Sequence, residues 1–132
     1  AGVDNFTGNR APEIAFVLTP HIGGRLGFLK YLPNTLLSFG GSNGYSNHVI
    51  GSPELRLSAV ADVNDDGRPD LAVPSANRQT LRIIGFTNNG LAELGVARLP
   101  SAIDKAILIT EIDGEIVFTV GLEDGTVYEV YR

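Results

Sequence analysis

Nine residues in the middle of the chain place oxygen-bearing side chains at a regular spacing. The segment reads Asp62-Val63-Asn64-Asp65-Asp66-Gly67-Arg68-Pro69-Asp70, so carboxylate or amide oxygens fall at loop positions 1, 3, 5 and 9. Calcium is a hard cation that binds about 6–8 oxygen ligands at about 2.3–2.6 Å, and a tight loop can present them around one point. Gly67 permits the sharp reversal that folds the loop around an ion. We predict a calcium site formed by the side chains of Asp62, Asn64, Asp66 and Asp70, by the backbone carbonyl of Arg68, and by water.

The first half of this loop matches an EF-hand, which begins D-x-N-x-D-G. An EF-hand also needs Glu at position 12 and a helix on each side. Position 12 is Val73, which lies in a short apolar run typical of a strand, so the EF-hand interpretation fails. A solvated Asp/Asn turn without an ion is the alternative to a metal loop.

Short apolar segments alternate with turn signals along the whole chain, and no window has the periodicity of an amphipathic helix. Asn88-Asn89-Gly90, Asp113-Gly114 and Asp124-Gly125 are typical of hairpin turns, in which glycine adopts a positive φ. We predict strands at Glu13–Leu18, Leu26–Lys30, Thr35–Phe39, Leu55–Asp62, Asp70–Pro74, Thr80–Phe86, Leu91–Ala97, Ala106–Ile112, Glu115–Val120 and Thr126–Tyr131.

Three of these strands share a pattern in which an acidic residue precedes an apolar run. They begin at Glu13, Asp70 and Glu115, and further strands follow each of them at similar intervals. Repeats of blade size with short strands are typical of a β-propeller. A β-sandwich is the alternative, but it would not explain the repeated spacing.

The pattern D-x-N-x-D-G-x-x-D-L followed by an apolar strand resembles the FG-GAP (VCBS) repeat of integrin α-subunit propellers and of many bacterial surface proteins. The specific motif covers about a dozen residues, and the weaker blade pattern covers most of the chain. The resemblance implies an all-β fold built from four-stranded antiparallel propeller blades, with Ca²⁺ bound between the first two strands of a blade. It divides the single partial propeller 1–132 into strands 2–4 of a blade (1–40), a complete blade (54–98) and strands 1–3 of a blade (105–132).

The other two blades depart from the calcium motif. In Asn5–Glu13 the aligned donors are Asn5, Thr7, Asn9 and Glu13, with a single carboxylate, so we expect weak calcium binding or none. In the third blade the loop has shrunk to the Asp113-Gly114 hairpin.

The resemblance also assigns ligand binding to the face opposite the calcium loop. On that face we expect His21 and the long loop Gly40–Pro53, which carries Tyr45, Asn47 and His48; long loops in compact domains are more often functional. The alternative is that the two histidines form hydrogen bonds between blades. Two histidines without a carboxylate at metal spacing are weak evidence for zinc.

Composition restricts the function. The net charge of −5 and the lack of a basic run argue against nucleic-acid partners, and no apolar run is long enough to span a membrane. The absence of cysteine excludes thiol catalysis and cysteine-ligated metals. We expect a non-catalytic, extracytoplasmic module that binds a protein or a glycan. The alternatives are a polysaccharide hydrolase or lyase that uses His21 or His48, and a purely structural repeat of a larger surface protein.

The strand count gives a last expectation, which concerns assembly. About two and a half blades cannot close a ring of 4–8 blades. We therefore expect a fragment of a longer protein, or a homo-oligomer that pairs through the open edges Glu13–Leu18 or Thr126–Tyr131, since exposed strand edges favour pairing.

Overall fold

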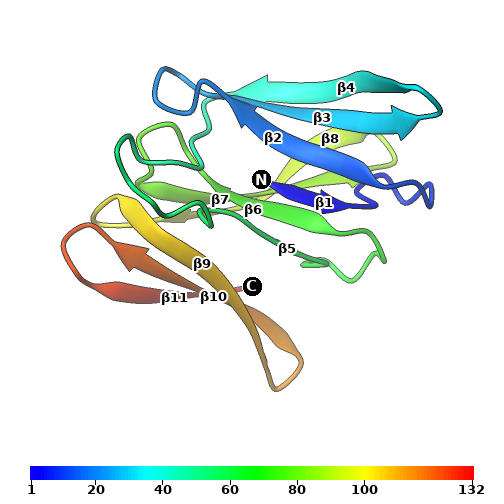
Figure 1. Cartoon of the computed structure of the whole chain (residues 1–132). Coiled ribbons are helices and arrows are strands. Elements are labelled where there is room, and N and C mark those ends of the chain that lie inside the picture. The colour runs from blue at the N-terminus through cyan, green and yellow to red at the C-terminus, as the bar shows by residue number, and fades with distance from the viewer.

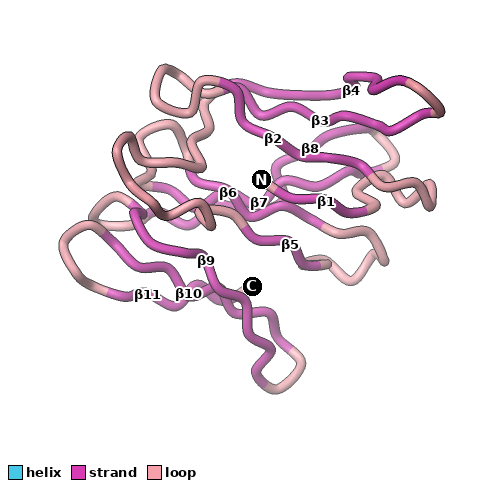
Figure 2. The backbone as a smooth tube through the Cα atoms, in the orientation of Figure 1, coloured by secondary structure: helices cyan, strands magenta, loops and turns pink.

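The computed structural model describes residues 1–132 and consists of strands and loops only (Figure 2). The eleven strands are β1 (Gly2–Asp4), β2 (Glu13–Leu18), β3 (Arg25–Leu32), β4 (Thr35–Asn43), β5 (Ala59–Ala61), β6 (Asp70–Pro74), β7 (Thr80–Thr87), β8 (Gly90–Arg98), β9 (Ile103–Ile112), β10 (Glu115–Leu122) and β11 (Val127–Tyr131). The prediction of an all-β fold is confirmed. The structure contains no helix with the length and apolar character that crossing a membrane requires.

The strands form three separate antiparallel sheets that stack side by side (Figure 1). Their orders are β1-β2-β3-β4, β5-β6-β7-β8 and β11-β10-β9, and we call them the first, second and third blades. In each blade consecutive strands are neighbours, as short hairpin connections require. The blade-like sheets match the expected partial blades in form.

The first and second blades have the same register between their first two strands. Asp4 lies opposite Glu13, and Ala61 lies opposite Asp70. The loops that follow, residues 5–12 and 62–69, are therefore of equal length and leave the sheets at equivalent points. This equivalence makes the first blade an internal comparison for the predicted calcium loop.

Three sequence-based boundaries are corrected by the structure. The first blade was expected to lack its first strand, but β1 pairs with β2. Because β1 covers Glu13–Ala15, the first half of this predicted edge is already paired within the chain, and pairing between chains through Glu13–Leu18 stays a prediction.

The predicted strand Leu55–Asp62 is shortened to β5. Its first residues run beside the third blade instead, where the carbonyl of Arg56 accepts a hydrogen bond from the N–H of Ile107. In contrast, β4 extends to Asn43, so the residues from Gly40 to Asn43 belong to a strand and not to the long loop.

Two apolar clusters join the three blades. Alternate residues of the fully buried strand β6 point in opposite directions, as the period of a strand dictates. Leu71 and Val73 pack with Phe28 of the first blade, whereas Ala72 packs with Phe118 of the third. Phe28 also meets Phe86 edge to face, with ring centroids 5.0 Å apart.

The loops gather at two ends of the blades (Figure 1). One end carries the β1–β2, β3–β4, β5–β6, β7–β8 and β9–β10 connections, including the predicted calcium loop. The other end carries the β2–β3, β4–β5, β6–β7, β8–β9 and β10–β11 connections, including both histidines. The predicted calcium loop and the histidines therefore lie at opposite ends.

Candidate metal site

The β5–β6 loop is folded by its own acidic side chains. Asp62 accepts hydrogen bonds from the backbone N–H groups of Asp66 and Gly67 at 3.1 and 2.8 Å. Asn64 accepts a second bond from the N–H of Asp66 at 3.1 Å. Gly67 has a φ of 80°, which a residue without Cβ adopts at little cost. The loop therefore turns back on itself with its side-chain oxygens on the inner side.

Asp70 closes the loop from the first position of β6 and is buried. Its Oδ2 accepts a hydrogen bond from the N–H of Val63 at 2.9 Å, but its Oδ1 is buried without any hydrogen-bond partner. Burial is the main cause that raises the pKa of Asp70 to about 6, and the neighbouring charges of Asp66 and Asp62 contribute to the same shift. An ionised carboxylate whose second oxygen is dry and unpaired is costly, and such a group calls for a proton or a cation.

Strand β7 leaves the space that Asp70 occupies. A Cβ added to Gly85 would lie 2.1 Å from Oδ1 of Asp70, closer than two non-bonded atoms can approach. Glycine in the interior of a strand often marks such a close approach. The sheet is therefore shaped around the carboxylate of Asp70.

A calcium ion requires several oxygen donors that converge on one point. As the side chains stand, no group of three acidic or histidine residues converges closely enough to hold a metal ion. The side chains of Asn64 and Asp66 are exposed, however, so they can change rotamer without repacking the core. Each carboxylate oxygen has two lone pairs. Each oxygen of Asp62 accepts one backbone hydrogen bond, so a second lone pair on it is free to bind an ion.

The remaining predicted ligand is the carbonyl of Arg68, which accepts no hydrogen bond within the chain. The guanidinium group of Arg68 donates hydrogen bonds to the carbonyl of Phe86 and to the side-chain oxygen of Asn88, at 3.0 and 2.9 Å. Asp65, with a φ of 58°, lies outside the donor set and pairs with Arg132. The donors Asp62, Asn64, Asp66, Arg68 and Asp70 thus fit a calcium ion in chemistry and in charge, with three carboxylates.

The equivalent loop of the first blade satisfies its carboxylate internally. Glu13 is buried, and its Oε2 accepts the N–H of Thr7 at 2.9 Å. Its Oε1 accepts the hydroxyl of Thr7 at 2.7 Å and the amide of Asn9 at 3.1 Å. The side-chain oxygen of Asn5 accepts a hydrogen bond from the backbone N–H of Arg10. No oxygen of Glu13 is left without a partner, in contrast to Asp70.

At the opposite end, the structure brings His21 and His48 together. Nε2 of His21 lies 2.8 Å from Nδ1 of His48, and Nε2 of His48 lies 3.0 Å from the carbonyl oxygen of Ser52. This geometry agrees with the alternative given above, in which the two histidines form hydrogen bonds that connect different parts of the chain. Asn47 is half-buried beside them.

Tyr45 does not lie on the exposed surface with the histidines. Only 2% of it is exposed, and the guanidinium carbon of Arg82 lies 4.3 Å from its ring centroid. Burial raises the pKa of the Tyr45 hydroxyl. The prediction that Tyr45 contributes to a ligand face is wrong, because the residue packs in the core between the first and second blades.

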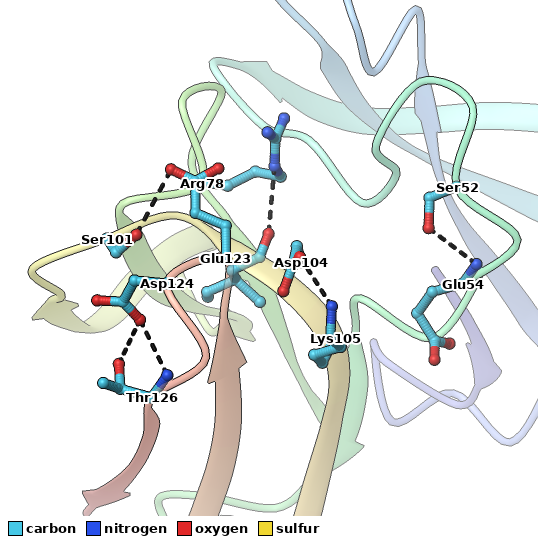
Figure 3. Close-up of polar contacts among 10 residues, drawn as sticks. Ser52, Glu54, Arg78, Ser101, Asp104, Lys105, Glu123, Asp124 and Thr126 are labelled. Carbon is cyan, nitrogen blue, oxygen red and sulfur yellow. Dashed lines mark hydrogen bonds and ion pairs between the residues drawn. The ribbon is translucent and has the colours of Figure 1, made fainter.

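The loops beside the third blade are held by polar contacts of their own (Figure 3). Ser101 donates to Glu123 at 3.5 Å, and Arg78 donates to the carbonyl of Ile103 at 3.2 Å. Asp124 accepts bonds from both the N–H and the hydroxyl of Thr126. These contacts fix the β6–β7, β8–β9 and β10–β11 connections relative to one another.

Comparison of the chain with protein-family models, with curated proteins and with solved structures gave no match.

Proposed function

We propose that the chain is a calcium-stabilised segment of a β-propeller and that it binds one calcium ion in the loop Asp62–Asp70. The observation that carries this proposal is the buried Oδ1 of Asp70, which has no hydrogen-bond partner in the chain and belongs to a carboxylate whose pKa the charges of Asp66 and Asp62 help to raise. A calcium ion would supply the missing partner and would offset the repulsion among Asp62, Asp66 and Asp70.

Calorimetric titration with calcium tests the proposal. Wild-type protein is expected to bind one ion, and Asp66→Ala is expected to abolish binding because the variant lacks a central donor of the loop. Asp65→Asn is the matched control, since it lies in the same loop and lowers the negative charge, yet its side chain faces Arg132. Equal calcium uptake by wild type and Asp66→Ala would overturn the proposal.

We further propose that the segment belongs to an extracytoplasmic protein and that the end with the histidines binds a protein or a glycan. Calcium loops of extracellular modules bind with dissociation constants of about 10⁻⁴–10⁻³ M, which suits millimolar calcium outside the cytosol. At the opposite end Ile22 and Ile50 are 82% and 78% exposed. Exposed apolar side chains among polar loops are typical of interaction surfaces when they gather in one place.

A screen of immobilised glycans and surface-protein fragments with the calcium-loaded protein tests this second proposal. Binding should be lost in Ile50→Asp and retained in Asn89→Asp, which adds the same charge to an exposed hairpin at the calcium end. Equal binding by these two variants would exclude the histidine end as the binding surface.

A further inference from the structure

The two histidines come from different connections and meet although 27 residues separate them in sequence. His21 lies in the turn between β2 and β3, and His48 lies in the linker between the first and second blades. His21 is exposed and His48 is half-buried, so the pair is accessible to ions from solvent. Their ring centroids are 5.0 Å apart with the planes inclined by 57°, so the rings do not stack in parallel.

The contact with Ser52 fixes the proton of His48. A carbonyl oxygen only accepts hydrogen bonds, so Nε2 of His48 carries the hydrogen and Nδ1 presents a lone pair toward His21. In metal sites a ligating histidine almost always donates its other ring N–H to a carboxylate, a carbonyl or water, which fixes the ring and its tautomer. His48 already has this outer contact.

We propose that Nε2 of His21 and Nδ1 of His48 form a two-nitrogen site for a divalent transition-metal ion, with Cu²⁺ as the preferred ion. The observed separation of 2.8 Å is that of the hydrogen bond between the two rings, so ligation requires the exposed ring of His21 to rotate until both lone pairs meet at the ion. The preference for Cu²⁺ therefore rests on the two nitrogen donors. Water occupies the remaining positions of the ion, and His21 carries its hydrogen on Nδ1 when its Nε2 ligates.

The composition of the chain makes this pair the only imidazole site. The sequence has two histidines, no cysteine and no methionine. Nitrogen ligands suit copper and nickel, and affinity in the first transition series is greatest for Cu²⁺, whereas the oxygen-only loop at the opposite end suits calcium. The two sites therefore differ in ligand type, and occupancy of one does not compete with occupancy of the other.

Metal binding at this pair would connect the β2–β3 turn with the linker that leads into the second blade. In the chain without metal, a single hydrogen bond makes that connection between side chains. Two coordination bonds would replace it, so the ion would stabilise the arrangement of the first two blades. Stabilisation by a ligand that binds only the folded chain grows with its free concentration.

Titration with CuCl₂ in excess calcium tests the proposal, followed by electron paramagnetic resonance of the bound copper. Wild type is expected to bind one Cu²⁺ with two equatorial nitrogen ligands. His21→Gln and His48→Gln should each lower the affinity at least about tenfold. Asp66→Ala, which alters the calcium loop, should bind copper as wild type does.

His21→Gln decides the result if His48→Gln misfolds, because His21 is exposed and glutamine can still donate to Nδ1 of His48. Circular dichroism spectra of the variant and of wild type should superimpose. A copper spectrum with a single imidazole nitrogen, or an affinity unchanged in His21→Gln, would overturn the proposal and would leave the pair as a hydrogen bond between loops.

Discussion

Replacing Asp70 with asparagine should stabilise the calcium-free protein and remove its response to calcium. In the native state the buried carboxylate has a pKa of about 6, against 3.8 for an ordinary aspartate, chiefly because burial disfavours its charged form. One pKa unit corresponds to about 1.4 kcal/mol, so the ionised group costs the native state roughly 2–3 kcal/mol at pH 7. Asparagine has no charge, and its amide can donate to the neighbouring carboxylates.

The pH dependence has a definite sign. Because the pKa of Asp70 is higher in the folded chain, the native state binds the proton more tightly than the unfolded chain does. The contribution of Asp70 to the free energy of unfolding is therefore complete below pH 3.8 and is lost as the pH rises to about 6. Without calcium, Asp70→Asn and wild type should be nearly equally stable near pH 4 and should separate by roughly 2–3 kcal/mol at pH 7.

Calcium should reverse this order. At a free concentration about 1,000 times its dissociation constant, an ion that binds only the folded chain adds about 4.1 kcal/mol. Wild type should gain this amount and Asp70→Asn very little. Urea unfolding in EDTA and in calcium, with Asp65→Asn as the control for lost charge, measures each difference. A variant that is less stable than wild type in EDTA at pH 7, or that gains equally from calcium, would refute the reasoning.

Three further predictions concern the surroundings of the loops and the edges of the sheets. Gly85→Ala should destabilise the fold by about 1–3 kcal/mol in thermal unfolding because its Cβ would overlap Asp70, whereas Gly95→Ala, whose nearest neighbour would be 3.7 Å away, should cost less than about 1 kcal/mol. Glu13→Gln should cost about 1–3 kcal/mol equally in EDTA and in calcium, because an amide nitrogen cannot accept both sets of bonds; a loss confined to one condition would show that this loop binds the ion. Light scattering should show association that increases with concentration, since β4 and β11 are open edges; a monomer at high micromolar concentration would contradict it.

Local chemistry explains why much of the fold was predictable. The Asp113-Gly114 turn was expected from its residue types, and the two residues have φ values of 53° and 83°, as a two-residue hairpin of this kind requires. The all-β class followed from the alternation of short apolar runs with such turns. These features depend on residues that are close in sequence, so no knowledge of distant contacts was needed.

The errors arose where distant contacts decide the structure. Strand β1 has three residues and little apolar character of its own, and it forms because β2 offers it a free edge. The residues before β5 lie beside the third blade, where the carbonyl of Arg56 accepts a hydrogen bond from the N–H of Ile107. Tyr45 lies in a loop, as expected, but its ring is buried between the first and second blades. The approach of His21 to His48 likewise depends on how two connections pack, which their spacing in sequence does not reveal.

The first two blades show how a small change at one position leaves a buried carboxylate oxygen without a partner. Glu13 and Asp70 occupy the same register position, and each is a buried carboxylate that starts a second strand. The additional methylene of Glu13 lets both of its oxygens reach donors within its own loop, from Thr7 and Asn9. Asp70 is shorter and reaches only the N–H of Val63, so one oxygen stays unpaired.

The sequences of the two loops agree with this difference. The loop closed by Glu13 contains no other carboxylate between Asn5 and Pro12, and hydrogen bonds from the loop satisfy both oxygens of Glu13. The loop closed by Asp70 places the carboxylates of Asp62 and Asp66 near a buried charge, and this arrangement raises the energy of the ionised Asp70. In the first blade, hydrogen bonds within the loop satisfy the buried carboxylate of Glu13. In the second blade, the loop leaves one oxygen of Asp70 without a partner and adds the negative charges of Asp62 and Asp66. That difference is the physical basis for our proposal that calcium binds in the second blade and not in the first.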